Sequence, residues 1–200
     1  MNGHALYAEP FRRFDEWFAA AGAQGSVLIP EPTAFSLASV GADGQPSLRI
    51  LLLKGVDEGG FVFYTNHESR KGREILAHPQ VAMCFHWMPL ERQVRVEGVA
   101  SVVSAAEADA YFASRPHGSQ IGAWASRQSE QIEQAGELEK RVLEVEREFE
   151  GRSVTRPPHW SGFRVVPARM EFWRGMPSRL HERHVFVREG DGWRTEVLYP

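Results

Sequence analysis

A run of basic residues opens a helix that the pattern predicts over residues 69–77. Residues 69–73 read Ser-Arg-Lys-Gly-Arg. The first turn of a helix carries partial positive charge, so cations there are unfavourable unless an anion lies among them. A phosphate group at a helix N-terminus is the usual anion of this kind. A solvated turn balanced by Glu68 and Glu74 explains the run equally well, and both interpretations stay open.

A second candidate phosphate site combines three side chains around a turn between two predicted helices. Tyr111 lies in a helix that ends at Arg115, and Ser119 is expected to cap the next helix. A hydroxyl, a guanidinium and a helix N-terminus can converge on one phosphate. A polar turn without a ligand is the alternative. Two such sites in one small protein indicate a phosphorylated cofactor beside a phosphorylated substrate.

Two further cations, Arg49 and Lys54, flank the apolar run over residues 50–53. An offset of five residues puts them on opposite faces of a regular strand, unless a bulge or bend intervenes. A ligand lying along the strand and two simple edge charges both explain them. Lysine is scarce, because only Lys54, Lys71 and Lys140 are lysines among 23 basic residues. This scarcity suggests that Lys54 and Lys71 are needed as compact ammonium groups.

Near the C-terminus, Arg179, His181 and Arg183 alternate with other residues. In an extended segment all three would face one side, which suits an anionic or electron-rich ligand. His181 and His184 are three residues apart, which is not the H-E-x-x-H spacing of a zinc site. We therefore expect no metal site.

The single cysteine and two tryptophans have structural interpretations. Cys84 lies in an apolar strand and is expected to be a small core residue, not a nucleophile. Trp160 and Trp173 are expected in the core or at an interface, with stacking on a planar ligand as the alternative.

The composition excludes several classes of function. Apolar residues make up 42% and charged residues 24% of the chain, as in ordinary globular proteins. The net charge of -3 argues against a nucleic-acid-binding surface. The longest strongly apolar run, residues 50–53, is too short to span a bilayer, and no signal-peptide pattern opens the chain. We expect a cytoplasmic protein that binds neither nucleic acid nor membrane.

The elements that must position these side chains are short strands with inserted helices. Strands are expected over residues 33–40, 47–53, 61–65, 81–87, 93–103, 163–166, 169–173, 185–188 and 193–198. Helices are expected over residues 10–21, 69–77, 104–114, 119–125 and 138–150, with a loop over residues 22–32. Ser104 and Glu107 have the spacing of a capping box for the third of these helices.

Hairpin turns link most of these strands, for example at Ala42-Asp43-Gly44. The pattern favours a mainly β protein with flanking helices (α+β), an antiparallel barrel or sheet, over alternating βαβ units. At 200 residues we expect a single domain, with an N-terminal helix and loop (1–31) followed by the barrel, its inserted helices and a C-terminal segment (32–200).

Nine short motifs occur in order between residue 32 and the C-terminus. They are Arg49-Ile-Leu-Leu-Leu-Lys54, Phe63-Tyr-Thr-Asn66, Ser69-Arg-Lys71, Glu91-Arg-Gln-Val94, Tyr111-Phe-x-x-Arg-Pro116, Ser119-Gln-Ile-Gly-Ala-Trp124, Ser126-Arg-Gln-Ser129, Glu171-Phe-Trp-Arg-Gly175 and Arg179-Leu-His-Glu-Arg183. Together they closely resemble the pyridoxamine (pyridoxine) 5'-phosphate oxidase family.

The resemblance implies an FMN-binding split antiparallel β-barrel that forms a homodimer, with two FMN molecules in the subunit interface. The FMN contacts that it implies are Arg49, Ile50, Leu51, Leu52, Leu53, Lys54, Tyr64, Thr65, Arg70, Lys71, Gln93, Gln128, Ser129, Trp173 and Arg183. The implied holders of the substrate phosphate are Lys54, Tyr111, Arg115 and Ser119. Arg179 and His181 are implied to lie against the substrate ring as the catalytic residues.

The activity that the resemblance implies is oxidation of pyridoxamine or pyridoxine 5'-phosphate to pyridoxal 5'-phosphate. FMN takes a hydride from C4', and O2 is reduced to H2O2. No general base is assigned, since the proton can leave to His181 or to water. The alternatives are a flavin oxidase of the phenazine-biosynthesis type, a deazaflavin-dependent reductase, and a non-catalytic carrier of flavin or pyridoxal phosphate.

The chain departs from the family pattern at both ends. About ten residues precede the first helix, where family members often carry a longer arm that can cover the substrate. The usual Arg-Leu-x-Pro ending reads Val197-Leu-Tyr-Pro200. Neither difference changes the residues that are implied to bind FMN or the substrate phosphate. The properties that these differences could change are lid closure and substrate affinity.

Overall fold

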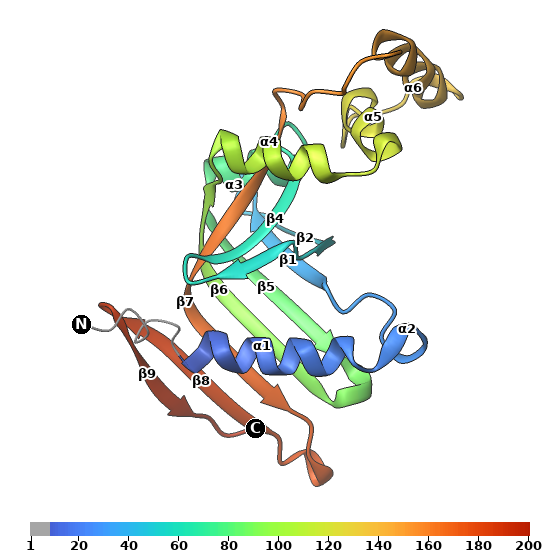
Figure 1. Ribbon diagram of the computed structural model, residues 1–200. Helices are drawn as coiled ribbons and strands as arrows, with labels where there is room; N and C mark the ends of the chain where they lie inside the picture. Colours follow the sequence, from blue (N-terminus) through green and yellow to red (C-terminus); the bar gives the residue numbers. More distant parts are fainter. Residues whose placement is uncertain (1–8) are drawn as a thin grey trace, which may run out of the picture.

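The computed structural model describes residues 9–200 and is built on one antiparallel sheet of nine strands (Figure 1). The strands are β1 (Ala34–Val40), β2 (Pro46–Leu52), β3 (Gly55–Asp57), β4 (Gly60–Asn66), β5 (Gln80–Trp87), β6 (Arg92–Val102), β7 (Trp160–Arg174), β8 (Glu182–Glu189) and β9 (Gly192–Val197). Their order is β2-β1-β5-β6-β7-β4-β3, and β8 and β9 extend the sheet from β7. The sheet curls into a half-barrel, which confirms the expected fold class. The N-terminal arm, residues 1–8, lies outside the described residues.

The longest strand, β7, separates two ends of the molecule. On one edge it pairs with β6 along its length, and on the other it pairs first with β4 and then with β8. Gly162 pairs with Tyr64 of β4, whereas Trp173 pairs with Arg183 of β8. These β7 positions are 11 residues apart (173 minus 162), which at about 3.3 Å per residue is about 35 Å.

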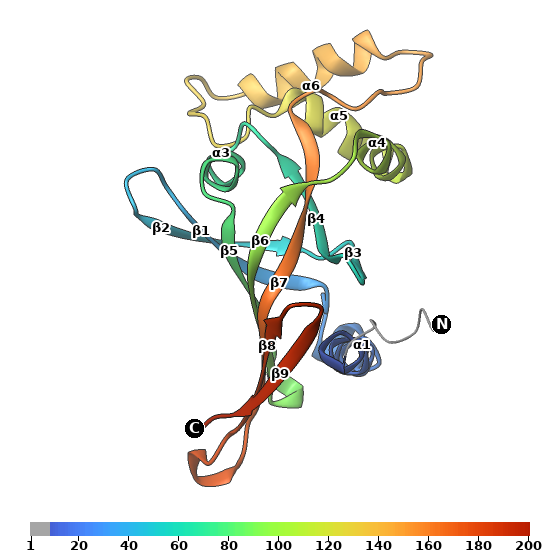
Figure 2. The ribbon, with the colours of Figure 1, turned by 90° about the vertical axis from the view of Figure 1, so that its left-hand side faces the viewer.

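The helices follow the same division. They are α1 (Glu9–Gly22), α2 (Gly25–Leu28), α3 (Arg70–Ala77), α4 (Ala105–Ser114), α5 (His117–Ala125) and α6 (Glu137–Glu148), with short 3-10 turns η1 (Met88–Leu90) and η2 (Pro177–Arg179). Helix α1 crosses one face of the sheet, whereas α4, α5 and α6 gather at the end opposite β8 and β9 (Figures 1 and 2). Among the described residues, no helix is both long enough and apolar enough to cross a membrane.

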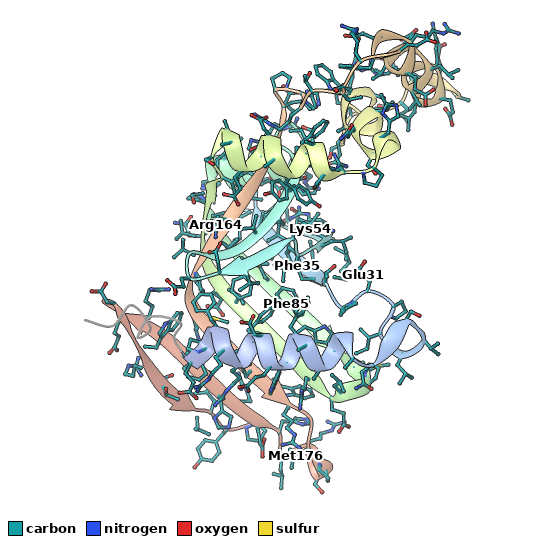
Figure 3. All side chains as sticks on the ribbon, viewed as in Figure 1. Glu31, Phe35, Lys54, Phe85, Arg164 and Met176 are labelled. Atoms are coloured by element: carbon teal, nitrogen blue, oxygen red, sulfur yellow. The ribbon has the colours of Figure 1, made fainter. Side chains whose placement is uncertain are left out.

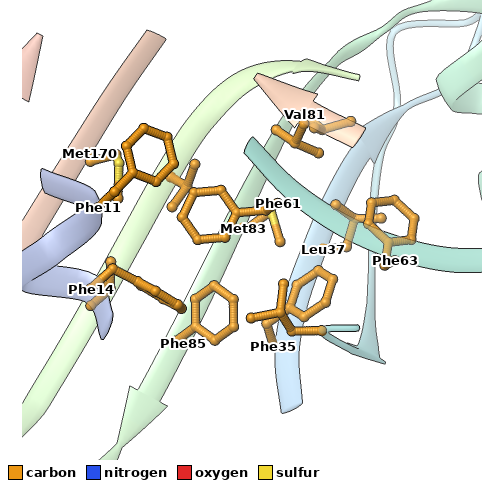
Figure 4. Close-up of a cluster of buried hydrophobic side chains, with 14 of the residues drawn as sticks. Phe11, Phe14, Phe35, Leu37, Phe61, Phe63, Val81, Met83, Phe85 and Met170 are labelled. Atoms are coloured by element: carbon orange, nitrogen blue, oxygen red, sulfur yellow. The ribbon is translucent and has the colours of Figure 1, made fainter. Parts of the chain in front are cut away.

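The core between α1 and the sheet consists largely of phenylalanines (Figure 4). The Phe14 ring of α1 meets Phe61 and Phe85 edge-on, with centroids 4.9 and 5.1 Å apart. Such pairs add about 0.5–1.5 kcal/mol each beyond the area they bury. Alternation along β5 turns Phe85 into this core and Cys84 to the opposite face, where it is half-buried. The core position expected for Cys84 is therefore wrong, although burial raises the pKa of its thiol and keeps it protonated.

Residues 163–166 and 169–173, predicted as two strands, belong to the single strand β7. Pro167 pairs with Gly98 and Arg169 with Glu97, so Ala168 is an extra residue at a β-bulge. A bulge accepts a proline, whose nitrogen has no hydrogen to donate to the sheet. Strand β7 therefore continues through Pro167, although proline in a sequence usually indicates the end of a strand.

Three smaller predictions were also wrong. The loop over residues 22–32 contains the short helix α2, and the unpredicted strand β3 pairs with β4. Helix α5 begins at His117, two residues earlier than expected, because Pro116 takes the N-cap position with φ at −54°. Proline's fixed φ suits the start of a helix. Ser119 therefore lies within the first turn of α5 and is not its cap.

Candidate functional site

A cavity of about 470 Å³ lies where the ends of β2 and β4 meet α3, α4 and α5. Its lining includes the predicted site residues Ile50, Leu51, Leu52, Lys54, Tyr64, Thr65, Lys71, Tyr111, Arg115, Ser119 and Gln128. The two candidate phosphate sites, which are separate in the sequence, thus share one cavity. Leu53 instead turns its side chain into the core, so the predicted contact of this residue with a ligand requires its backbone.

Three stacked aromatic rings form one wall of the cavity. The Tyr64 and Tyr111 rings are 3.9 Å apart at centroid and nearly parallel, and Trp160 stacks 5.4 Å from Tyr64. Burial raises the pKa of both tyrosine hydroxyls, so each remains protonated and able to donate a hydrogen bond. Trp160 is thus a core residue, as expected, and also forms part of the cavity wall, whereas its stacking on a planar ligand stays a prediction.

Arg115 rests on this wall with an unsatisfied donor. Its guanidinium lies 4.7 Å from the centre of the Trp160 ring. Its buried Nη1 has no hydrogen-bond partner among the described residues. Burial also lowers the pKa of Arg115, although guanidinium stays charged in proteins. A buried cationic donor without a partner fits an anion in the cavity.

Lys54 reaches the same cavity because the chain turns after β2. The strand ends at Leu52, and the Lys54 N–H donates to the Val62 carbonyl of β4 at 2.8 Å. Arg49 does not line this cavity and lies instead at an adjoining hollow around the start of α3. Lys54 therefore lies beside the residues of the second candidate phosphate site.

Lys71 lies at the start of α3 and contacts neutral oxygens. Its Nζ is 2.7 Å from Gln128 Oε1 and 3.3 Å from both Thr65 Oγ1 and Ser69 Oγ. Burial lowers its pKa, and nearby Arg49 lowers it further. No ion pair joins Lys71 to a carboxylate in the described part of the chain, so this ammonium group also fits an incoming phosphate.

An adjoining hollow joins α3 to the loop after α5. Its walls include Ser47, Arg49, Arg70, Lys71, Gln128 and Ser129. The Arg70 backbone N–H donates to Ser129 Oγ at 3.1 Å. Ser129 has a φ of 77°, an uncommon value for a residue with a side chain. The fold thus brings Gln128 and Ser129 next to the basic start of α3.

Glu74, which is 7% exposed, balances part of this charge. It accepts hydrogen bonds from Ser39, Ser47, Arg49 and Arg70, the last at 2.8 Å. Burial alone raises the pKa of Glu74, but these hydrogen bonds outweigh it and lower the pKa to about 2. The counter-charge interpretation of the basic run therefore holds for Arg70, which Glu74 neutralises, whereas a phosphate beside Lys71 stays a prediction.

A second cluster lies at the β8 end. Gln93, Trp173 and Arg183 are neighbours across β6, β7 and β8. Beside them Glu171, 1% exposed, pairs with three arginines at positions 95, 169 and 183; the Arg183 Nε contact is 2.8 Å. Burial raises the pKa of Glu171, yet the arginines hold it at about 2.

The predicted row of Arg179, His181 and Arg183 is wrong, because the segment is not extended. Ser178 and Arg179 have φ values of 59° and 61° and form part of η2. The His181 ring lies 4.7 Å from the Trp173 ring, and Arg183, which pairs with Trp173 across the strands, donates to Glu171 on the same face, so the row is broken at Arg179. Positive φ at two residues other than glycine is a strained arrangement that sequence alone does not indicate.

The two clusters lie at opposite ends of β7, about 35 Å apart by the strand register. Figure 3 shows the same separation, with Lys54 beside β4 and Met176 at the tip of the β7–β8 connection. One chain therefore brings together the predicted residues of the cavity but not Gln93, Trp173, Arg179, His181 and Arg183 with them.

Sequence reasoning missed the two carboxylates that organise these clusters. The sequence indicates Glu74 only as a counter-charge of the basic turn and Glu171 only as part of a motif. The spacing of four between Arg70 and Glu74 is the one local signal for the first pair. Nothing local indicates that Glu171 is buried beside three arginines.

Comparison with known proteins agrees with the motif resemblance. Residues 24–148 match the family described as pyridoxamine 5'-phosphate oxidase, and residues 160–200 match the pyridoxine 5'-phosphate oxidase C-terminal dimerisation region. A pyridoxine/pyridoxamine 5'-phosphate oxidase of Myxococcus xanthus is 59% identical over 192 residues, covering 96% of this chain and 92% of the relative. One of Rubrobacter xylanophilus is 57% identical, with coverage of 96% and 87%.

Solved structures show the same fold. One is PhzG of Burkholderia lata in complex with tetrahydrophenazine-1-carboxylic acid. It has a TM-score of 0.89 at 30% identity, and the match covers 96% of this chain and 93% of the PhzG chain. An FMN-binding protein of Nostoc punctiforme has a TM-score of 0.72 at 18% identity, covering 92% and 96%.

The family match supports FMN as the cofactor, and the C-terminal match supports the expected homodimer. The residues present also fit FMN, since a basic helix start with an ammonium group lacking a carboxylate suits its phosphate. The chain belongs to the pyridoxamine 5'-phosphate oxidase family and is an oxidoreductase.

Proposed function

We propose that this protein oxidises pyridoxamine 5'-phosphate and pyridoxine 5'-phosphate to pyridoxal 5'-phosphate, with O2 as electron acceptor and H2O2 as product. The observation that carries the proposal is Arg115, whose buried Nη1 lacks a partner in the cavity that Lys71 also lines. Bound FMN supplies the redox chemistry by accepting a hydride from C4' and passing two electrons to O2.

In this proposal Lys71 and Arg70 hold the phosphate of FMN at the start of α3. Gln128 and Ser129 approach the same place from the loop after α5. The strand from Arg49 to Lys54, with Tyr64 and Thr65, lies along the rest of the cofactor. Glu74 fixes the Arg70 guanidinium through its Nε and leaves the Nη groups free for phosphate oxygens.

The substrate phosphate is held by Lys54, Tyr111, Arg115 and Ser119. Tyr111 and Ser119 supply hydroxyl donors, and the two cations supply charge-assisted hydrogen bonds. These contacts exist before and after hydride loss, so they bind and position the substrate without changing its reactivity.

The remaining residues come, in this proposal, from a second copy of the chain. Gln93, Trp173 and Arg183 complete the FMN site, and Arg179 and His181 orient the substrate ring. A twofold dimer gives two identical sites of this kind, each using the cavity of one copy and the β8 end of the other.

Oxidation of a phenazine precursor is the second candidate, because the similar PhzG structure contains tetrahydrophenazine-1-carboxylic acid. The four side chains that can surround a phosphate favour pyridoxamine and pyridoxine 5'-phosphate as substrates over the phenazine precursor.

We also propose that the protein is cytoplasmic, which cell fractionation tests.

A peroxide-coupled assay tests the function with both phosphorylated vitamers, the same vitamers without phosphate, and the phenazine precursor. We expect peroxide from the phosphorylated vitamers and a KM raised about tenfold or more in Arg115→Ala, with kcat nearly unchanged. The matched control is Arg127→Ala, an exposed arginine close in sequence. Equal turnover with and without the phosphate would contradict the proposal.

A further inference from the structure

One hydrogen bond fixes the position of the proton on His181. The backbone N–H of Met176 donates to His181 Nδ1 at 3.1 Å. A backbone N–H can only donate, so Nδ1 must present its lone pair. A neutral imidazole carries one proton, which is therefore on Nε2.

The ring is held in this orientation from a second side. The Trp173 ring lies 4.7 Å from the His181 ring at an interplanar angle of 47°. The Gly175 N–H donates to the Glu91 carbonyl at 2.8 Å, which anchors the segment just before Met176. A Cβ atom at Gly175 would come within 2.9 Å of the Glu91 Cβ, so the chain packs closely here.

The turn between Met176 and His181 is strained. Ser178 and Arg179 both have positive φ, and the Leu180 N–H donates to the Pro177 carbonyl at 3.2 Å. Strain of this kind persists only where surrounding contacts hold it, and it is common at functional sites. The Met176–His181 hydrogen bond closes this turn and couples the histidine tautomer to the backbone that carries Arg179.

We propose that His181 is a hydrogen-bond donor to the substrate through Nε2–H and does not accept the substrate proton. This inference rests on the proposed function. Nε2 has no lone pair in this tautomer, and Nδ1 can accept a proton only if the bond from Met176 breaks. Water takes the proton that C4' oxidation releases.

The balance of the reaction is then complete without a protein base. From pyridoxine 5'-phosphate, C4' loses a hydride to the flavin and its hydroxyl loses a proton to water, which leaves the aldehyde. From pyridoxamine 5'-phosphate with a neutral amine, hydride loss leaves an iminium ion, which water hydrolyses to the aldehyde and an ammonium ion. His181 donates its hydrogen bond to an acceptor atom of the substrate throughout and keeps its own proton.

Two substitutions of His181 distinguish a hydrogen-bond donor from a general base. Glutamine can place an amide N–H near the position of imidazole Nε2, whereas asparagine reaches only the position of Nδ1. We expect His181→Asn to lose about tenfold or more in kcat relative to His181→Gln, because only glutamine keeps a donor at the Nε2 position. A general base contributes about 10²–10⁴-fold, so a loss of that size in His181→Gln would overturn the proposal.

Nitrogen-15 NMR of the FMN-loaded dimer tests the tautomer without substrate, and His181→Gln identifies the signals by their loss. We expect a pyridine-type shift for Nδ1 and a pyrrole-type shift for Nε2. The reverse assignment would overturn the proposal whatever the activity. If the tautomer is as expected but neither vitamer is oxidised, the proposed function fails and the tautomer assignment stands.

Discussion

The two ends of the sheet each hold a buried carboxylate among arginines, yet they are built differently. Glu74 lies at the α3 end beside a cavity that one chain encloses. Glu171 lies at the β8 end, where Trp173 and His181 meet at the tip of a strand pair. One end thus contains the cavity, and in the proposed function the other end supplies side chains to a second copy.

Exposed apolar residues on β2 support this division. Leu48 and Ile50 are 67% and 62% exposed, and Ile50 also lines the cavity. Exposed apolar side chains that cluster together mark interaction surfaces. The face of β2 that carries them therefore suits the dimer contact that the C-terminal family match supports.

The largest expected effect is on the stability of the β8 end. Glu171→Ala leaves Arg95, Arg169 and Arg183 without their shared counter-charge, and breaking a buried ion pair costs about 3–5 kcal/mol. Urea unfolding of the apo dimer at one fixed protein concentration measures this. Glu97→Ala, which removes an exposed partner of Arg169, is the control and should cost at most about 1 kcal/mol. Equal losses in the two variants would contradict the central role of Glu171.

Catalysis should depend strongly on the same end. We expect Arg179→Ala to lower kcat by about 10²-fold, because a displacement of 1 Å at the reacting carbon can cost that much. FMN content should stay normal, since Arg179 is not assigned to the flavin. Steady-state kinetics and flavin absorbance measure both, with Arg194→Ala on β9 as the control. Loss of FMN with normal kcat in the remaining holoenzyme would show that the assignment is wrong.

Cofactor affinity should depend on the α3 end. Arg70→Ala removes a charge-assisted phosphate contact, which should weaken FMN binding by about 1.5–3 kcal/mol. Riboflavin, which lacks the phosphate, should bind both proteins equally. Arg73→Ala is the control on the same helix, because its guanidinium bonds the Glu68 carbonyl instead. Fluorescence titration with both flavins measures the difference, and an equal loss for riboflavin would contradict a phosphate contact.

The smallest effect is a shared response to acid. The folded pKa of about 2 for Glu74 and Glu171 lies below their ordinary value of 4.5. A depressed carboxylate pKa stabilises the fold above pH 4.5, and this stabilisation is lost as pH falls toward 2. The urea concentration at the unfolding midpoint should stay constant between pH 7 and about pH 5.5 and decrease below pH 5.5. Glu171→Gln should flatten that fall, and an unchanged slope would contradict the pairing.

The structural features that could be predicted from the sequence are those that depend on residues close together in the chain. The cations at the start of α3, the cap at Ser104 and most strands are local patterns, and the structure contains them. The continuity of β7 through Pro167 depends on its pairing with β6, which no local pattern records.

The site was harder to predict because its geometry is tertiary. The sequence indicated two phosphate sites, but their union in one cavity requires the packing of α3 against the loop after α5. The left-handed backbone at Arg179 and the burial of Glu171 likewise follow from contacts between distant segments.

The most direct test of a site shared between two copies is a purified heterodimer. One copy carries Lys71→Glu in the cavity, and the other carries Arg179→Ala with His181→Ala at the β8 end; two different tags allow isolation. If sites are shared, one site receives both defects and the other receives none. We expect about half of the wild-type activity per heterodimer, while each parent homodimer keeps about 1% or less. Heterodimer activity no higher than that of the parents would mean that each site lies within one chain, which contradicts the account.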